Sequence, residues 1–377
     1  MGRHRNGPAE PDDFDPEQTT RYTPQRLELR TRRAPRAPLW ARLCVSFGVI
    51  VLLVSGSVYA GTYLLTARYE SNIKRADLLG NASRAGQKRA EVKGPMNILV
   101  VGSDSRANET YDPSDPSSSA AFVKGERSDT IMLMHLPATM DHGYAISIPR
   151  DAYVNIPPVK GRWKGGKDKI NAAMGHGGVP HLVKTIQNFS GLTIDHVVIV
   201  DFSGLRRITD AVGGVDVYVD KQTVDPYRPN RVFKKGLNTL DGETAEAYVR
   251  QRKGLPGNDY DRMKRQQQYL HALMTKITAT GVMTDAGKMD DLMLAVTESI
   301  TVDEGMQVKG LAFALKKLRP SDVTFLTIPM IGGQKMGGVW YEMVDEPGDR
   351  ALFAAIKGGT MDAYLLQNPP NDVSHGS

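Results

Sequence analysis

The sequence predicts an α/β fold: a domain with a central β-sheet covered by helices. Short apolar runs at 97–102, 130–136, 144–148, 197–200 and 215–219 are typical of strands. Stretches at 170–189 and 202–212 between them are typical of helices. A helix at 308–318 and a strand at 323–328 continue the pattern. Strands that alternate with helices favour one sheet packed against helices.

The composition excludes several classes of protein. Hydrophobic residues make up 40% and charged residues 24% of the 377 residues, which excludes a wholly disordered chain and a polytopic membrane protein. The single cysteine, Cys44, excludes a disulfide scaffold, a zinc finger and an iron–sulfur protein. The net charge of +6 suits contact with an anionic surface or substrate and does not require nucleic acid.

One uncharged segment predicts a transmembrane helix. Residues 43–67 contain no acid or base over 25 positions, which exceeds the roughly 20 residues that span a bilayer. Residues 21–42 hold seven arginines and one acid, whereas 68–89 hold six bases and two acids, and this bias favours a cytoplasmic N-terminus. A cleaved signal peptide is the alternative, and the 38-residue leader argues against it.

The chain is therefore predicted to have four parts. Residues 1–42 form a disordered cytoplasmic tail, and 43–67 form a single membrane anchor. Residues 68–94 form a charged helical stalk. Residues 95–370 form an extracytoplasmic catalytic domain, so the predicted location is the cell membrane.

The predicted helix that starts at Asp259 carries charged groups on its buried side. At about 100° per residue, the apolar stripe of 270–277 continues backward through Asp259, Arg262 and Gln266. Buried charges are costly unless they are paired or bind a ligand. These side chains therefore either pair with one another or line a pocket for an anion.

Arginines gather at the ends of the predicted strands and around this helix. The guanidinium group suits bidentate contact with phosphate. Asp104 and Asp129, next to strand ends, are carboxylates of the kind that hold Mg²⁺ beside a phosphate. The combination indicates phosphoryl transfer, and a solvated basic face is the alternative. The candidate arginines are Arg106, Arg127, Arg150, Arg250, Arg252, Arg262 and Arg265.

Several common catalytic motifs are missing from the sequence. It has no phosphate-binding loop of the Gly-x-x-x-x-Gly-Lys-Ser/Thr type and no protein-kinase signature, which argues against nucleotide use. It also lacks the His-Glu-x-x-His motif of zinc proteases, and its histidines show no metal-ligand spacing. The chemistry is therefore expected to rest on arginines and carboxylates.

Seven segments, in order, resemble the LytR–CpsA–Psr family of bacterial cell-wall proteins. Each segment is short, and their order over 96–271 makes the resemblance specific. The segments are NILVVGSDSR (97–106), RSDTIML (127–133), SIPRD (147–151), KINAA (169–173), VVIVDFSGLRRITDAVGG (197–214), LDGETAEAYVRQR (240–252) and DYDRMKRQQ (259–267).

The resemblance implies an α-β-α sandwich with a central mixed sheet and an apolar tunnel for a prenyl chain. It implies a phosphotransferase that moves a glycopolymer from a polyprenyl-diphosphate carrier onto peptidoglycan. Asp104 and Asp129 would hold Mg²⁺ (or Mn²⁺), and Asp259 would be a base for the acceptor hydroxyl. The other implied catalytic residues are Arg127, Arg150, Arg250 and Arg252, with Arg106, Lys169, Arg262, Arg265 and Gln266 binding the diphosphate.

Other functions remain open from the sequence. The Arg-rich tail and basic pI resemble actinobacterial members of the family, whose glycopolymer would be arabinogalactan. A receptor or regulator that binds the lipid without turnover is one alternative, and a pyrophosphatase that cleaves the same carrier is another. A nucleic-acid binder is disfavoured, because no recognition helix is found and the anchor places the domain outside the cytoplasm.

Overall fold

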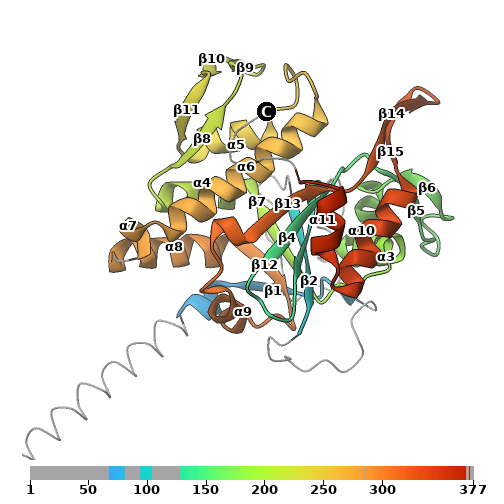
Figure 1. Ribbon diagram of the computed structural model, residues 1–377, viewed down its shortest axis with the longest axis horizontal. Helices are drawn as coiled ribbons and strands as arrows, with labels where there is room; N and C mark the ends of the chain where they lie inside the picture. Colours follow the sequence, from blue (N-terminus) through green and yellow to red (C-terminus); the bar gives the residue numbers. More distant parts are fainter. Residues whose placement is uncertain (1–67, 81–93, 104–127, 284, 371–372, 374–377) are drawn as a thin grey trace, which may run out of the picture. The chain divides into compact units, whose positions relative to one another are not determined.

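The computed structural model describes residues 68–80, 94–103, 128–283, 285–370 and 373 (Figure 1). The chain divides into two compact units, 1–61 and 62–377, and every described residue belongs to the second. The predicted tail and anchor at 1–67 lie outside the described residues. Among the helices that the structure describes, none combines the length and the apolar character that crossing a bilayer requires.

A seven-stranded mixed sheet forms the centre of the second unit, which confirms the predicted fold class. The strand order is β1-β12-β7-β2-β3-β4-β13. Strand β2 runs antiparallel to β3 and parallel to β7, and β4 runs parallel to β13. The strands are β1 (Lys74–Ala76), β2 (Met96–Ser103), β3 (Ser128–Leu136), β4 (Gly143–Ile148), β7 (His196–Asp201), β12 (Ile300–Asp303) and β13 (Val323–Thr327).

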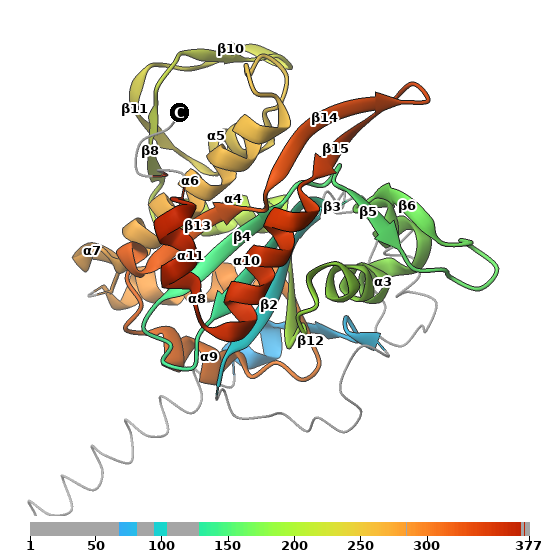
Figure 2. The same cartoon turned by 45° about the vertical axis from the view of Figure 1, so that its right-hand side comes forward.

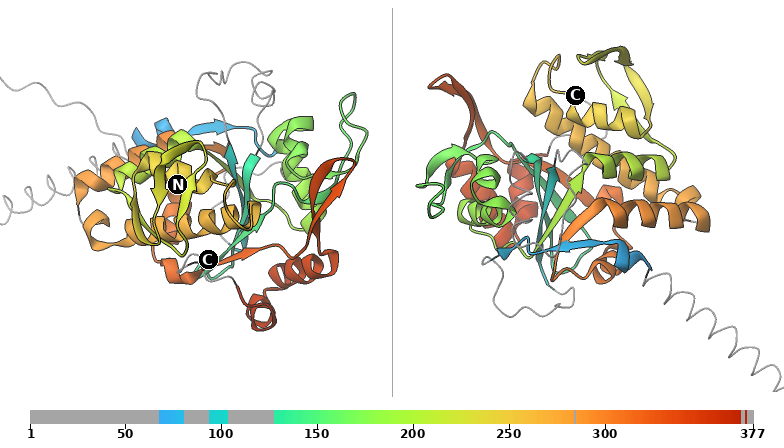
Figure 3. Two further views of the ribbon diagram at one scale, coloured as in Figure 1. Left: turned by 90° about the horizontal axis from the view of Figure 1, so that it is seen from above. Right: turned by 180° about the vertical axis from the view of Figure 1, so that it is seen from behind.

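Helices cover both faces of this sheet (Figures 1 and 3). On one face, α3 and α10 pack against β2, β3 and β4 in the largest apolar cluster. On the other face, Met132 and Phe325 pack against α6, and Ile98 and Val302 pack against α9. The helices are α3 (Ala172–Ser190), α4 (Phe202–Ala211), α5 (Gly242–Arg250), α6 (Asp259–Thr278), α7 (Thr280–Met283), α8 (Ala286–Ser299), α9 (Val308–Leu315), α10 (Glu346–Gly358) and α11 (Met361–Gln367).

Four two-stranded ladders stand apart from the central sheet. They are β5 (Tyr153–Ile156) with β6 (Gly166–Lys169), β8 (Val215–Val219) with β11 (Gly236–Leu240), β9 (Thr223–Asp225) with β10 (Arg228–Phe233), and β14 (Met330–Met336) with β15 (Val339–Val344). The run predicted at 215–219 is thus a strand, although it pairs with β11 outside the central sheet. The β14–β15 hairpin projects from the body of the unit (Figure 2).

The helix predicted over 68–94 is present at 68–72 and was wrong at 74–76, while 81–93 lie outside the described residues. Lys74–Ala76 form strand β1, which pairs in parallel with β12 at one edge of the sheet. Ile73, Leu78 and Leu79 around it are buried. Apolar burial, which helical charge patterning does not reveal, ties this segment into the domain, so the folded unit begins before residue 95.

Candidate functional site

The connection between α5 and α6 builds the centre of the site. Asp241 caps α5, its Oδ1 accepting a hydrogen bond from the Thr244 amide at 2.8 Å. After Arg250 the chain turns through Gly254 and Asn258, both with positive φ. Asp261 then accepts a hydrogen bond from the Gly257 amide at 2.7 Å and fixes the first turn of α6.

This turn places a buried carboxylate among three guanidinium groups. Asp259 is 4% exposed. Its Oδ1 lies 2.9 Å from Arg262 Nη2, 3.6 Å from Arg252 Nε and 3.9 Å from Arg150 Nε. The arginines come from the end of β4, the α5–α6 turn and α6, so three segments of the chain converge here. The predicted pairing of these charges therefore occurs, and the arginines also line a cavity. That the cavity binds an anion stays a prediction.

A second carboxylate, Asp151, extends the cluster toward Lys169. Lys169 Nζ lies 2.8 Å from Asp151 Oδ1, while Arg150 Nε and Arg252 Nη2 lie 3.8 and 3.9 Å from Oδ2. Asp151 was quoted in the SIPRD segment and was not predicted as a site residue. Its position directly after a buried strand that Pro149 ends is the signal that could have identified it.

A cavity of about 610 Å³ opens beside this cluster. Eight basic and three acidic side chains line it, an excess of five positive charges. Such an excess in a walled cavity attracts anions. Sequence reasoning missed the three arginines that other segments bring to this cavity, Arg206 of α4 and Arg228 and Arg231 of β10. The basic residues are Arg150, Arg206, Arg228, Arg231, Arg250, Arg252, Lys253 and Arg262, and the acidic residues are Asp225, Glu243 and Glu246.

Two further predicted residues also line this cavity. Arg250 Nη1 donates to Glu246 Oε1 at 2.7 Å, and its guanidinium lies 4.6 Å from the centre of the Phe202 ring. Gln266 is buried and donates to the Val249 carbonyl at 3.2 Å. Six predicted residues therefore meet at one place: Arg150, Arg250, Arg252, Asp259, Arg262 and Gln266, with Lys169 joined to them through Asp151.

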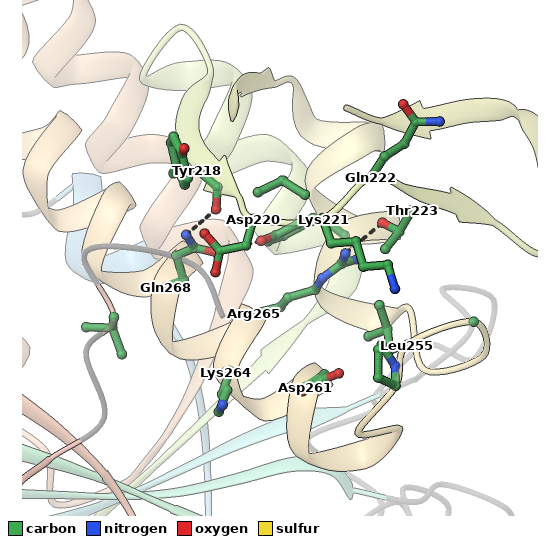
Figure 4. Close-up of a pocket in the computed structure, with 15 residues that line it drawn as sticks. Tyr218, Asp220, Lys221, Gln222, Thr223, Leu255, Asp261, Lys264, Arg265 and Gln268 are labelled. Carbon is green, nitrogen blue, oxygen red and sulfur yellow. Dashed lines mark hydrogen bonds between the residues drawn. The ribbon is translucent and has the colours of Figure 1, made fainter. Parts of the chain in front are cut away.

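Arg265 lies elsewhere. It lines a smaller cavity of about 270 Å³ on another side of α6 (Figure 4). Its guanidinium donates to Gln251 Oε1 and to Thr223 Oγ1, both at 2.7 Å, and lies 4.4 Å from the centre of the Tyr248 ring. Burial lowers the pKa of Arg265 from its ordinary value. The N–H groups of Arg265 therefore donate to other side chains of the protein. Arg265 is not part of the cluster around Asp259.

The remaining predicted residues are described only in part. Asp104, Arg106 and Arg127 lie outside the described residues. Asp129 belongs to β3 at an irregularity in the β2–β3 ladder, between the Gly102–Thr130 and Ser103–Ser128 pairs. Within the described ranges, no group of three or more His, Cys, Asp or Glu side chains is arranged to hold a metal ion.

The two predicted magnesium ligands, Asp104 and Asp129, are both carboxylates. Asp129 lies where β3 meets the carboxyl end of β2, and in the sequence Asp104 directly follows Ser103, the last residue of β2. Mg²⁺ binds through one or two carboxylates and completes its shell with water and substrate phosphate.

The comparisons with known proteins agree with the fold and the segments. Cell wall biosynthesis protein LcpA of Corynebacterium glutamicum is 30% identical over 342 residues, which cover 83% of this chain and 65% of LcpA. Polyisoprenyl-teichoic acid–peptidoglycan teichoic acid transferase TagU of Bacillus anthracis is 30% identical over 308 residues, covering 80% of this chain and 91% of TagU. The crystal structure of Bacillus subtilis TagV superposes with a TM-score of 0.55 at 29% identity, covering 71% of this chain and 98% of TagV.

The family profile covers most of the domain described above. The LytR_cpsA_psr family matches residues 62–357, which include β1 and every segment that carried the resemblance. The match starts before residue 68, consistent with the inclusion of β1 in the sheet. The chain belongs to the LytR–CpsA–Psr family.

Proposed function

We propose that this protein is a phosphotransferase that attaches a glycopolymer from a polyprenyl-diphosphate carrier to peptidoglycan. The observation that carries the proposal is the cluster of Arg150, Arg252 and Arg262 around Asp259, beside a cavity with an excess of positive charge. A diphosphate is a compact polyanion with many acceptor oxygens, which matches several converging guanidinium groups. The names of LcpA and TagU support a role in the cell wall and in transfer to peptidoglycan.

The proposed step exchanges a phosphoanhydride bond for a phosphate ester bond. A sugar hydroxyl of the acceptor attacks the phosphorus that bears the glycopolymer, and its oxygen forms the new P–O bond. The bond from that phosphorus to the bridging oxygen breaks, and polyprenyl phosphate leaves with the bond's electron pair. The product is a phosphodiester between glycopolymer and peptidoglycan. Negative charge grows on the bridging oxygen, so fixed guanidinium groups lower the barrier mainly by charge stabilisation.

The two carboxylates hold the cations ready for this step. Three guanidinium groups within 4 Å of Asp259 Oδ1 would repel one another without it. Asp151 does the same for Lys169 and Arg252. We assign Asp259 the additional role of proton acceptor for the attacking hydroxyl, because it is the carboxylate at the centre of the cluster. Diphosphate entry would draw the arginines toward its oxygens and release one carboxylate oxygen for that proton.

A divalent cation completes the proposal. Asp104 and Asp129 would hold Mg²⁺ (or Mn²⁺), whose charge would neutralise phosphate oxygens and orient the diphosphate. The residues of the described cluster would then bind the diphosphate and its developing charge, while Asp104 and Asp129 would hold the metal ion that neutralises phosphate oxygens.

The location and the glycan are further parts of the proposal. Residues 43–67 anchor the chain in the membrane with the N-terminus in the cytoplasm, so the domain meets the lipid carrier outside the cell. Arabinogalactan is the proposed glycopolymer, supported by the basic Arg-rich tail and by the similarity to a corynebacterial wall protein.

Mass spectrometry of a defined reaction tests the transfer. The full chain in detergent is incubated with a polyprenyl-diphosphate oligosaccharide, Mg²⁺ and a peptidoglycan fragment. A sugar-phosphate adduct on the fragment, absent when the metal is chelated, is the expected product. If the only products at every acceptor concentration are free phospho-sugar and polyprenyl phosphate, the protein is a pyrophosphatase and not a transferase. If the protein binds the lipid and forms no product, it is a receptor and not a transferase.

A further inference from the structure

Two hairpins beside the cluster present polar and aromatic side chains toward each other. Strand residues alternate between two faces. Val154 and Ile156 of β5 are buried in the core, so Tyr153 and Asn155 lie on the opposite face with their neighbours on β6, Lys169 and Lys167. On the other hairpin, Tyr341 of β15 is paired with Gln334 of β14 and shares its face.

These two faces meet through their aromatic rings. The rings of Tyr153 and Tyr341 lie edge to face, 4.9 Å apart. Lys169 Nζ lies 5.6 Å from the centre of the Tyr341 ring, and Lys167 Nζ lies 5.9 Å from the centre of the Tyr153 ring. We call this set the hairpin patch: Tyr153, Asn155, Lys167, Lys169, Gln334 and Tyr341. Asn155, Lys167 and Gln334 are exposed, and the other three are half-buried.

The hairpin patch is continuous with the proposed reaction site. Lys169 belongs to both, because its Nζ lies 2.8 Å from Asp151 Oδ1. The Glu342 amide also donates to the Asp151 carbonyl at 2.9 Å, which fixes β15 against the residue that organises the cations. A ligand on the hairpin patch would therefore extend directly from the place where phosphate is proposed to react.

We propose that the hairpin patch binds the acceptor glycan strand, an inference that rests on the proposed function and names the subsite for its second substrate. Pyranose rings present apolar C–H faces that pack on tyrosine rings, whose hydroxyl groups remain available for hydrogen bonds. Exposed amides of Asn155 and Gln334 match the hydroxyl and N-acetyl groups of a hexosamine. Lys167 lies 3.2 Å from Glu346 Oε1, in an exposed ion pair that a carboxylate of peptidoglycan would have to displace.

The exposed side chains of the patch favour the cell wall over the membrane as its partner, because Asn155, Lys167 and Gln334 are all polar. The hairpin that carries Gln334 also lies far from β1. Strand β1, where the chain enters the sheet, and β13, which leads into β14, form opposite edges of the seven-stranded sheet. The β14–β15 hairpin accordingly projects away from β1 (Figures 1 and 2).

Co-sedimentation with purified peptidoglycan sacculi tests the inference without requiring turnover. We expect the full chain in detergent to pellet with sacculi. Tyr341→Ala, and separately the double variant Asn155→Ala with Gln334→Ala, should each weaken binding about five- to tenfold, a factor that one or two lost contacts give. Tyr341→Ala could also move Lys169, whose Nζ lies 5.6 Å from the centre of the Tyr341 ring. The double variant removes only exposed amides, so it tests the patch without that effect.

The matched control lies on the same strand. Trp340 precedes Tyr341 and therefore points to the other face of β15, where its indole donates to Glu342 Oε1 at 3.0 Å. Trp340→Ala should bind sacculi like the unaltered chain. The inference is overturned if the unaltered chain does not pellet, if the patch variants bind like Trp340→Ala, or if they lose binding to anionic phospholipid vesicles instead.

The same variants separate this inference from the proposed function. In the transfer assay, Tyr341→Ala should raise the KM for the acceptor about tenfold, with a much smaller effect on the KM for the lipid donor. If sacculus binding depends on the patch and no variant or unaltered chain transfers phosphate, the glycan subsite stands and the transferase fails. If transfer occurs and is indifferent to the patch, the transferase stands and the subsite fails.

Discussion

Arg262 and Arg265 lie three residues apart on α6, are both almost fully buried, and have different surroundings. Arg262 contacts the carboxylate of Asp259, which it shares with Arg150 and Arg252, and faces the larger cavity. Arg265 donates its hydrogen bonds to two neutral side chains, Gln251 and Thr223, and the Tyr248 ring lies against its guanidinium. Figure 4 shows Arg265 beside Thr223.

The contrast separates a binding guanidinium from a structural one. Around Asp259, three positive charges share one negative charge, so the cluster retains an unbalanced positive charge that an anionic ligand can neutralise. Around Arg265, the protein itself supplies the acceptors that the desolvated cation needs. Whether an arginine can bind a ligand therefore depends on where its N–H donors are directed. The number of arginines in a segment does not reveal this.

The largest effect is expected at Arg252, whose side chain is 39% exposed and can reach a ligand. Arg252→Ala should lower turnover by a factor on the order of 10²–10³, because it removes a charge aimed at the developing oxyanion. Its melting temperature should change little. Steady-state transfer rates and calorimetry measure both, with Arg350→Ala, an exposed arginine on α10, as the control. Equal activity of the two variants would contradict the assignment.

Replacing Arg265 should reverse that pattern. Arg265→Met leaves the acceptors of Gln251 and Thr223 without their donor, which should cost about 2–3 kcal/mol of unfolding free energy. The melting temperature should fall several degrees, and the KM for the donor should stay within about threefold. A variant as stable as the unaltered chain with turnover as low as Arg252→Ala would place Arg265 in the reaction site after all.

Asp349 shows what a buried charge does without such a partner. It is 3% exposed in the first turn of α10, and its carboxylate oxygens have no hydrogen-bond partner among the described residues. Burial, followed by the charges of Asp345 and Glu346, raises the pKa of Asp349 to about 7. The contrast with Asp259 is direct, since three guanidinium groups surround that carboxylate.

The sign of the resulting pH dependence follows from linkage. Between pH 4 and 7 the folded state keeps a proton on Asp349 that the unfolded state has lost, so the free energy of unfolding falls as pH rises. Asp349→Asn should remove that slope and stabilise the chain at pH 8 by about 1–2 kcal/mol. Urea unfolding at pH 5 and pH 8 measures it, with Glu304→Gln, an exposed acid, as the control. An unchanged slope in Asp349→Asn would remove this group from the pH dependence.

The sequence predicts the parts of this site that depend on local periodicity. The buried strands, the cap at Asp241 and the inward side of α6 all follow from spacing within one segment. Arg265 was grouped with the diphosphate-binding residues by type, and its actual partner Thr223 lies 42 residues away on β9. Arg206 and Arg231 were missed for the same reason: their roles depend on which segments the fold brings together.

The smallest effect concerns the rim of the cavity, where charges are exposed. Arg228, 65% exposed, and Arg231 both pair with Glu243. Arg228→Ala should raise the KM for the donor only about two- to threefold at low salt, because solvent and ions screen exposed charges. Glu243→Gln removes the negative charge of the same ion pair and should lower the KM for the donor. The two variants should therefore change this KM in opposite directions. Both effects should vanish near 1 M salt, where the screening length falls to about 3 Å. A KM that rises in both variants would mean that the pair holds the β9–β10 hairpin in place, so its contribution would be structural and would belong with Arg265.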